Sequence, residues 1–270
     1  MKRIDVYGED SSDVPLVVMN SYEGDGRSVY DLVRTMTDDE FRLMNISGLD
    51  WDHDMSPWDA PPMFGGRDPF TAGADDHIEW ILDEAIPAHV CTDPEIIIAG
   101  YSMAGMFAVY SVYRTDRFSK VVSVSGSLWF PDLMEFISSH RPKRIPEKAY
   151  VSLGDRESRT RNPVLSKVEE CSRKVEESFR MMGSETLFEL NPGNHFQDPD
   201  KRMAKGIAWA LRRSQEPVQT GADDLLAVAH RLPIYVHKIH LLALAAVVAS
   251  VADHSVGALH ASVQVEYRLE

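Results

Sequence analysis

The strongest indication of the fold is the segment Glu95-Ile96-Ile97-Ile98-Ala99-Gly100-Tyr101-Ser102-Met103-Ala104-Gly105. Its first part is short, apolar and β-branched, which is typical of a central strand in a parallel sheet. The residues from Met103 to Tyr113 are small or apolar and predict a helix that follows at once. Ser102 therefore lies in a tight turn between a strand and a helix, which exposes its hydroxyl at the carboxyl edge of the sheet. This placement is typical of a catalytic nucleophile.

The turn around Ser102 requires small neighbours because its backbone is strained. Gly100 precedes it, and Ala104 and Gly105 follow. The usual pattern is G-x-S-x-G, so Ala104 is a departure, although alanine is still small. The backbone N–H of Met103, at the start of the helix, is predicted to stabilise an acyl oxygen that gains negative charge. The alternative is an ordinary strand-turn-helix with a serine there by chance.

Strand and helix signals alternate from the N-terminus to about residue 213. They predict strands over 14–19, 41–46, 95–100, 120–124, 148–154 and 186–190, and helices over 27–36, 75–85, 103–113, 131–138, 163–182 and 198–213. This alternation predicts a mostly parallel sheet with helices on both faces. Together with the turn at Ser102, it predicts an α/β-hydrolase fold, with a catalytic domain over residues 1–214.

Residues 215–270 differ in composition from the rest. They hold five of the ten histidines and a short apolar run, Leu241–Ala252. The run is too short for a membrane span of about 20 residues. No two of these histidines are four residues apart, as a pair of metal ligands on one helix face would be, and they have few acidic neighbours. We interpret this segment as a C-terminal extension: a packed helix, a loosely ordered extension or non-native sequence.

Composition excludes some classes of partner. The net charge of −14 argues against nucleic acid and anionic lipid as partners. The two cysteines form no CxxC pair, so neither a metal nor another cofactor is expected. The N-terminus lacks the apolar core of a secretory signal, which makes the cytoplasm the expected location. The sequence leaves a homo-oligomer open.

The partners of Ser102 should follow it in the order acid, then histidine. His195 lies in a turn-rich segment between the last predicted strand and the last predicted helix, where a general base can reach the serine. The acid should follow the preceding strand, where Gly154-Asp155-Arg156-Glu157 offers two carboxylates. We predict Glu157, three residues beyond the glycine, with Asp155 as the alternative, because either could orient the imidazole.

Other residues are candidates for contacts with the substrate. The loop after the first buried strand predicts the backbone N–H of Tyr22 as the second oxyanion donor, although this loop lacks the His-Gly pair of common esterases. Ligand crevices of α/β sheets lie beyond the carboxyl ends of strands. The candidate substrate-binding residues are Trp51, Trp58 and Tyr101, with Asp52 or Asp54 for hydroxyl or cationic groups and Arg156 or Arg159 for an anionic group. The alternative for the two tryptophans is that they pack the loop on the sheet.

Four motifs together resemble the esterase family of α/β-hydrolases that includes esterase D, enterobactin esterase and feruloyl esterases. They are Gly-Tyr-Ser-Met-Ala-Gly at 100–105, Ser-Gly-Ser-Leu-Trp-Phe at 125–130, Leu-Gly-Asp-Arg-Glu at 153–157 and Asn-Pro-Gly-Asn-His-Phe at 191–196. The resemblance covers roughly residues 10–213. It implies Ser102 as nucleophile, His195 as base and Glu157 as acid.

The resemblance implies hydrolysis of a carboxylic ester through an acyl-enzyme, or acyl transfer as in some relatives. The family is broad, so the small-molecule ester that this chain would take does not carry over. A noncatalytic binding protein that keeps the fold is the alternative from another class.

Overall fold

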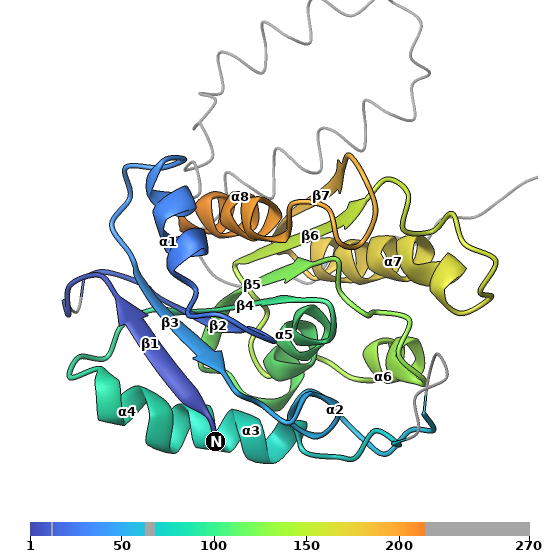
Figure 1. Cartoon of the computed structure of the whole chain (residues 1–270), viewed down its shortest axis with the longest axis horizontal. Coiled ribbons are helices and arrows are strands. Elements are labelled where there is room, and N and C mark those ends of the chain that lie inside the picture. The colour runs from blue at the N-terminus through green and yellow to red at the C-terminus, as the bar shows by residue number, and fades with distance from the viewer. Residues whose placement is uncertain (12, 63–67, 214–270) are drawn as a thin grey trace, which may run out of the picture. The chain divides into compact units, whose positions relative to one another are not determined.

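The computed structural model describes residues 1–11, 13–62 and 68–213, so the predicted extension over 215–270 lies outside the described residues. The described part contains a seven-stranded sheet in the order β1-β3-β2-β4-β5-β6-β7 (Figure 1). Every neighbouring pair is parallel except β1 and β3. The predicted fold class, a mostly parallel sheet with flanking helices, is confirmed.

The elements follow the predicted alternation, with boundaries that differ by a few residues. The strands are β1 (Arg3–Tyr7), β2 (Leu16–Asn20), β3 (Arg42–Ser47), β4 (Ile96–Tyr101), β5 (Phe118–Val124), β6 (Lys148–Gly154) and β7 (Glu185–Asn191). The helices are α1 (Arg27–Arg34), α2 (Trp51–Asp54), α3 (Ala74–Trp80), the π-helical η1 (Ile81–Ala85), α4 (Ile86–His89), α5 (Met103–Arg114), α6 (Leu133–Ser139), the 3₁₀-helical η2 (Leu165–Lys167), α7 (Val168–Met181) and α8 (Pro199–Leu211).

The edge strand β1 and the short helix α2 were not predicted. In β1, apolar Ile4 and Val6 alternate with polar Arg3 and Asp5, which is the pattern of a strand with one buried face. Ile4 and Val6 are partly buried against the main core. The strand pairs antiparallel with β3 and closes that edge of the sheet.

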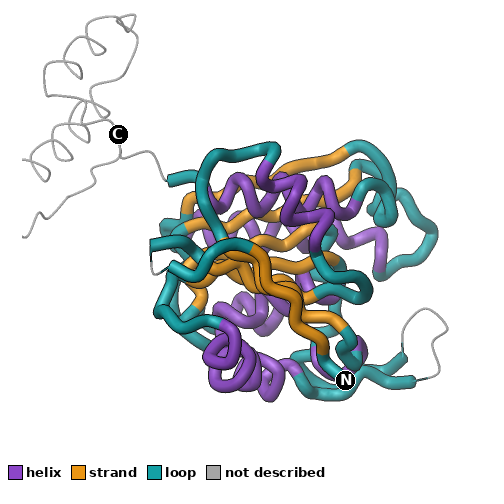
Figure 2. The backbone as a smooth tube through the Cα atoms, turned by 60° about the vertical axis from the view of Figure 1, so that its left-hand side comes forward, coloured by secondary structure: helices purple, strands orange, loops and turns teal. Residues whose placement is uncertain are grey.

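Helices cover both faces of the sheet, and each face has its own apolar core. On one face, Val17 and Ile97 pack with the apolar side of α8 and with α1. On the other face, their neighbours Val18 and Ile98 pack with α3, α5, α6 and α7, for example with Phe107. The central strands are therefore apolar on both faces, as expected for a covered parallel sheet. Figure 2 shows the strands as a twisted layer between the helices.

The register of the sheet brings the predicted site loops together. Asn20 at the end of β2 lies opposite Gly100 in β4. Gly154 at the end of β6 lies opposite Asn191 at the end of β7. Because parallel strands end at one edge, the loops after β2, β4, β6 and β7 begin along that edge, and these loops carry the predicted triad and oxyanion residues.

A buried histidine ties the end of β2 to α3 and the N-terminus. Lys2 Nζ donates to His77 Nδ1 at 2.9 Å, and His77 Nε2–H donates to Asn20 Oδ1 at 2.9 Å. Burial, and then the positive charge of Lys2, lower the pKa of His77 from 6.5 to about 3. The imidazole is therefore neutral in the folded protein at neutral pH.

Replacing His77 with glutamine is expected to remove an acid-sensitive part of the stability. The unfolded chain protonates His77 below pH 6.5 and the folded chain does so only near pH 3, so stability falls as the pH drops through this window. Between pH 7 and 5 the wild type should lose about 2 kcal/mol more than His77→Gln. Urea unfolding at both pH values measures the difference, and equal losses would contradict this assignment.

Among the described residues, the structure contains no helix with the length and apolar composition of a membrane span.

Candidate active site

Ser102 lies in a strained turn between β4 and α5. Its φ and ψ are 59° and −123°, a conformation that residues other than glycine rarely adopt. Two backbone hydrogen bonds hold the turn: the Ser102 N–H donates to Val124 O at 3.1 Å, and the Ser127 N–H donates to Ser102 O at 2.9 Å. Strain that the surrounding structure maintains in this way is typical of functional sites.

The small neighbours of Ser102 have different tasks. A Cβ on Gly100 would lie 2.1 Å from Ala104 O, so only glycine fits there. Ala104 itself is fully buried, and its methyl group uses the space that Gly100 leaves. Gly105 lies close to the loop after β5: a Cβ on Gly105 would lie 3.0 Å from Gly126 Cα, so a larger residue would crowd that loop. The turn thus accommodates alanine at the fifth position of the motif.

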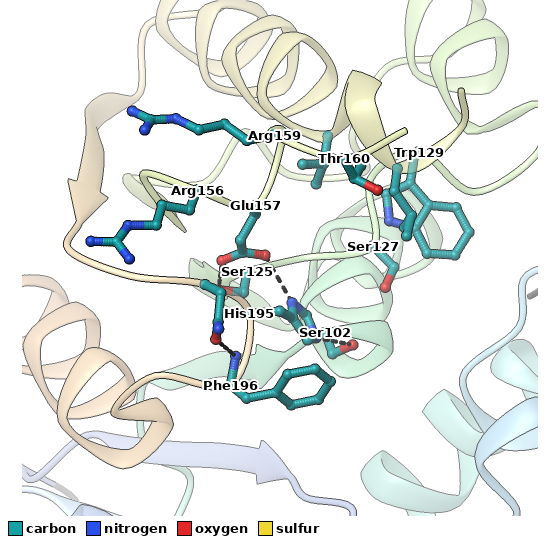
Figure 3. A pocket seen from close by; sticks show the side chains of 13 residues that line it. Ser102, Ser125, Ser127, Trp129, Arg156, Glu157, Arg159, Thr160, His195 and Phe196 are labelled. Carbon is teal, nitrogen blue, oxygen red and sulfur yellow. Dashed lines mark hydrogen bonds and ion pairs between the residues drawn. The ribbon is translucent and has the colours of Figure 1, made fainter. Parts of the chain in front are cut away.

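Ser102, His195 and Glu157 form one chain of hydrogen bonds (Figure 3). The Ser102 hydroxyl and His195 Nε2 are 3.1 Å apart, and His195 Nδ1–H donates to Glu157 Oε2 at 2.8 Å. The Glu157 side chain is 4% exposed and that of His195 is 32% exposed. A hydroxyl, an imidazole and a buried carboxylate in this order are the arrangement that activates a serine nucleophile.

The second oxygen of Glu157 has its own partners. Ser125 Oγ and the Gly154 N–H each donate to Oε1 at 2.6 Å. Burial raises the pKa of Glu157, but hydrogen bonds from His195, Ser125 and Gly154 outweigh it, so the pKa lies below the ordinary range. The carboxylate is therefore ionised at neutral pH and can stabilise an imidazolium.

Asp155, the alternative acid, lies beside Glu157 but does not contact His195. Its Oδ1 accepts a hydrogen bond from the Gly193 N–H at 2.8 Å, and its own N–H donates to Asn191 O at 2.7 Å. Asp155 thus holds the loop that carries His195. The structure brings Glu157, and not Asp155, to the imidazole.

Two further residues contact the Glu157 carboxylate and were not among the sequence candidates. Ser125 has a φ of 47° and is 1% exposed. Arg202 on α8 is 2% exposed. Arg202 lies four residues before the buried Gly206, on the apolar face of the predicted helix. Because arginine is rarely buried without a partner, its place on this face could have been recognised in the sequence as a sign of a functional or structural role.

One predicted oxyanion donor begins a helix, and the other lies in the loop after β2. Met103 is the first residue of α5, directly after Ser102. Tyr22 follows β2, its side chain is exposed, and its ring packs edge-on against Trp51 at 5.4 Å between centroids. The roles of the Met103 and Tyr22 N–H groups stay predictions.

A cavity of about 500 Å³ opens beside Ser102 and His195. Its apolar walls include Trp129, Leu165, Val168 and Phe196. Phe196 is 84% exposed, and its ring lies edge-on to His195 at 5.2 Å. A large exposed aromatic side chain beside a candidate base suits contact with an apolar part of a ligand.

The predicted substrate-binding tryptophans lie elsewhere. Neither Trp51 nor Trp58 lines this cavity. Trp58 Nε1–H donates to Pro131 O at 3.0 Å, and its ring packs against Phe130 and Phe136. This arrangement corresponds to the alternative in which the tryptophans pack the loop.

Of the polar residues predicted to bind substrate, the two arginines line the cavity and the two aspartates do not. Asp54 pairs with Lys2 at 3.2 Å, and neither Asp52 nor Asp54 lines the cavity. Arg156 and Arg159 do line it, but Figure 3 shows both side chains extending away from Ser102.

Tyr101 does not line the cavity; its hydroxyl donates to His195 O at 2.5 Å. Within the part of the chain that the structure describes, no group of three or more His, Cys, Asp or Glu side chains is arranged to hold a metal ion.

Comparisons with known proteins concern the fold of the chain. No family model matches the chain. The uncharacterized protein YbbA of Bacillus subtilis is 21% identical over 192 residues, which are 66% of this chain and 75% of that protein. An IroE-like serine hydrolase from Shewanella oneidensis superposes with a TM-score of 0.62 at 15% identity, over 77% of this chain and 75% of that one. The enterobactin esterase FES from Shigella flexneri superposes with a TM-score of 0.55 at 16% identity, over 77% of this chain and 55% of that one.

At these identities the likeness shows a shared fold. The α/β-hydrolase fold predicted from the turn at Ser102 is confirmed, and the solved structures with this fold include the kind of esterase that the four motifs resemble.

Proposed function

We propose that this chain is a serine hydrolase that cleaves a carboxylic ester through an acyl-enzyme. The observation that carries the proposal is the continuous chain of hydrogen bonds from Ser102 through His195 to Glu157 at the edge of an open cavity. The fold shared with a serine hydrolase and an enterobactin esterase supports ester hydrolysis as the class of reaction. The cavity volume and its apolar walls support a small-molecule ester with an apolar part.

In the first half of the proposed reaction, His195 Nε2 takes the proton of the Ser102 hydroxyl as Oγ attacks the ester carbonyl. Glu157 holds the imidazole in the required tautomer and stabilises the imidazolium that forms. The Met103 N–H donates to the oxyanion. His195 then gives its proton to the leaving alcohol, and the acyl group remains on Ser102.

In the second half, a water molecule takes the place of the alcohol. His195 accepts its proton while the oxygen attacks the acyl carbon, and the bond to Ser102 Oγ breaks as the serine regains a proton. The products are a carboxylic acid and the free enzyme. An alcohol in place of water would give a new ester, which is the acyltransferase alternative.

A panel of p-nitrophenyl esters of increasing acyl length tests this function. We expect turnover of short-chain esters that depends on Ser102, with the free acid as product whether or not a second alcohol is present. A new ester formed with the added alcohol would identify an acyltransferase. No turnover of any ester by a sample that melts cooperatively would favour the noncatalytic alternative.

A further inference from the structure

Arg202 on α8 is the largest of the fully buried side chains in the described residues, with 2% of it exposed. A guanidinium is always charged, and burial of a charge is unfavourable unless partners satisfy it. The proposed chemistry assigns no role to this charge. Its partners therefore indicate what it does.

The partners of the Arg202 guanidinium belong to segments that converge on the candidate triad. Nη2 donates to Pro192 O at 2.9 Å, in the loop that carries His195. Nη1 lies 3.4 Å from each of three oxygens: Glu157 Oε1, Ser125 Oγ and the Tyr101 hydroxyl. A distance of 3.4 Å is long for a hydrogen bond, so the bond to Pro192 is the strong one and the contact with Glu157 is mainly electrostatic.

Two glycines leave the space that the guanidinium occupies. A Cβ on Gly154 would lie 3.1 Å from Arg202 Nη1 and 2.5 Å from Gly193 O. A Cβ on Gly193, whose φ is +108°, would lie 3.4 Å from Nη2. The loop with Glu157 and the loop with His195 therefore approach each other closely, and Arg202 contacts both.

The contacts of Glu157 are divided between its two oxygens. Oε2 faces His195, whereas Oε1 faces Ser125, the Gly154 N–H and Arg202. Because Oε1 is fixed, the carboxylate cannot rotate without losing these partners. Tyr101 extends the same cluster, because its hydroxyl contacts both Arg202 and the carbonyl of His195.

We propose that Arg202 is a positioning residue that holds Glu157 and the loop of His195 in fixed positions relative to each other. The hydrogen bond between the Glu157 carboxylate and the His195 imidazole is maintained in this way. This inference rests on the proposed function. Arg202 does not line the cavity, so it acts through these two residues and not through contact with the ester.

Arg202→Met, which keeps much of the side-chain volume, tests the proposal. We expect kcat to fall about 100-fold, as for a small misplacement of reacting groups. KM should stay within about twofold, because ground-state binding does not involve Arg202. Arg202→Lys keeps the charge but not the planar guanidinium, so its kcat should lie between those of the wild type and Arg202→Met.

Lys148→Met is the matched control. Lys148 is also a cation with a 2% exposed side chain, and its Nζ donates to Arg212 O at 2.8 Å, away from the triad. Its loss should lower the melting temperature while kcat stays within about twofold. A general effect of removing a buried cation would instead lower kcat in both variants.

A double-mutant cycle shows whether Arg202 acts through the acid. In a Glu157→Gln background, Arg202→Met should lower kcat by clearly less than in the wild-type background, because only its effect on the His195 loop, through Pro192 O, then remains. Full additivity, an unchanged kcat in folded Arg202→Met, or a rise in KM alone would overturn the inference. If Arg202→Met does not fold, Arg202→Lys with wild-type kcat overturns it. A different result, wild-type protein that shows no turnover dependent on Ser102, would overturn the proposed function itself.

Discussion

Replacing Ser102 with alanine is expected to lower kcat for ester hydrolysis by about 10⁶-fold, because no other group can form the acyl-enzyme. The fold should be unaffected, since alanine keeps the backbone and the two hydrogen bonds that the Ser102 N–H and carbonyl make. Residual catalysis from positioning alone should remain above the uncatalysed rate. Initial rates with a p-nitrophenyl ester, measured beside a thermal melt, give both quantities.

Ser127→Ala provides a matched control for this variant. Ser127 lines the same cavity, but its hydrogen bond to the turn at Ser102 is donated by its backbone N–H and not by its hydroxyl. Its replacement should change kcat by less than about tenfold. If the two serine variants lose activity equally, or if Ser102→Ala keeps most of its turnover, Ser102 is not the nucleophile.

Replacing Glu157 with glutamine is expected to lower kcat by about 10⁴-fold at neutral pH. The amide keeps the shape of the side chain, but it carries no negative charge to stabilise an imidazolium, and it can hold His195 in the wrong tautomer. KM should change little, because the effect arises as charge develops on the imidazole. Steady-state kinetics at pH 7 separates the two constants.

Asp155→Asn is the corresponding control, because it changes the neighbouring carboxylate in the same way. Asp155 contacts the Gly193 N–H and not His195, so its variant should lose less than about tenfold in kcat. A larger loss in Asp155→Asn than in Glu157→Gln would reverse the assignment of the acid.

The central part of the site could be predicted because its signals are local. A strand of β-branched residues, a glycine and a helix of small residues place Ser102 without reference to the rest of the chain. His195 and Glu157 follow from the order of strands, since each lies just beyond a predicted strand end. The choice between Glu157 and Asp155 depends on which carboxylate faces the imidazole, and the structure brings only Glu157 there.

Other features depend on contacts between distant segments, which periodicity does not encode. Trp58 packs against Phe136, 78 residues away in the chain, and a tryptophan in an irregular loop is equally compatible with a pocket wall. Trp129 lines the cavity, although only its place in the motif at 125–130 had been noted. Arg202 contacts Glu157 only because α8 packs beside both loops, so this contact follows from the tertiary structure.

A fluorophosphonate probe can identify Ser102 as the nucleophile, because it reacts covalently with a serine that an adjacent base has activated. The folded protein is incubated with the probe, digested and analysed by peptide mass spectrometry. We expect one adduct, on Ser102, that is absent from Ser102→Ala and much slower to form in Glu157→Gln. No adduct on folded wild-type protein, or an adduct on another residue that persists in Ser102→Ala, would contradict this assignment.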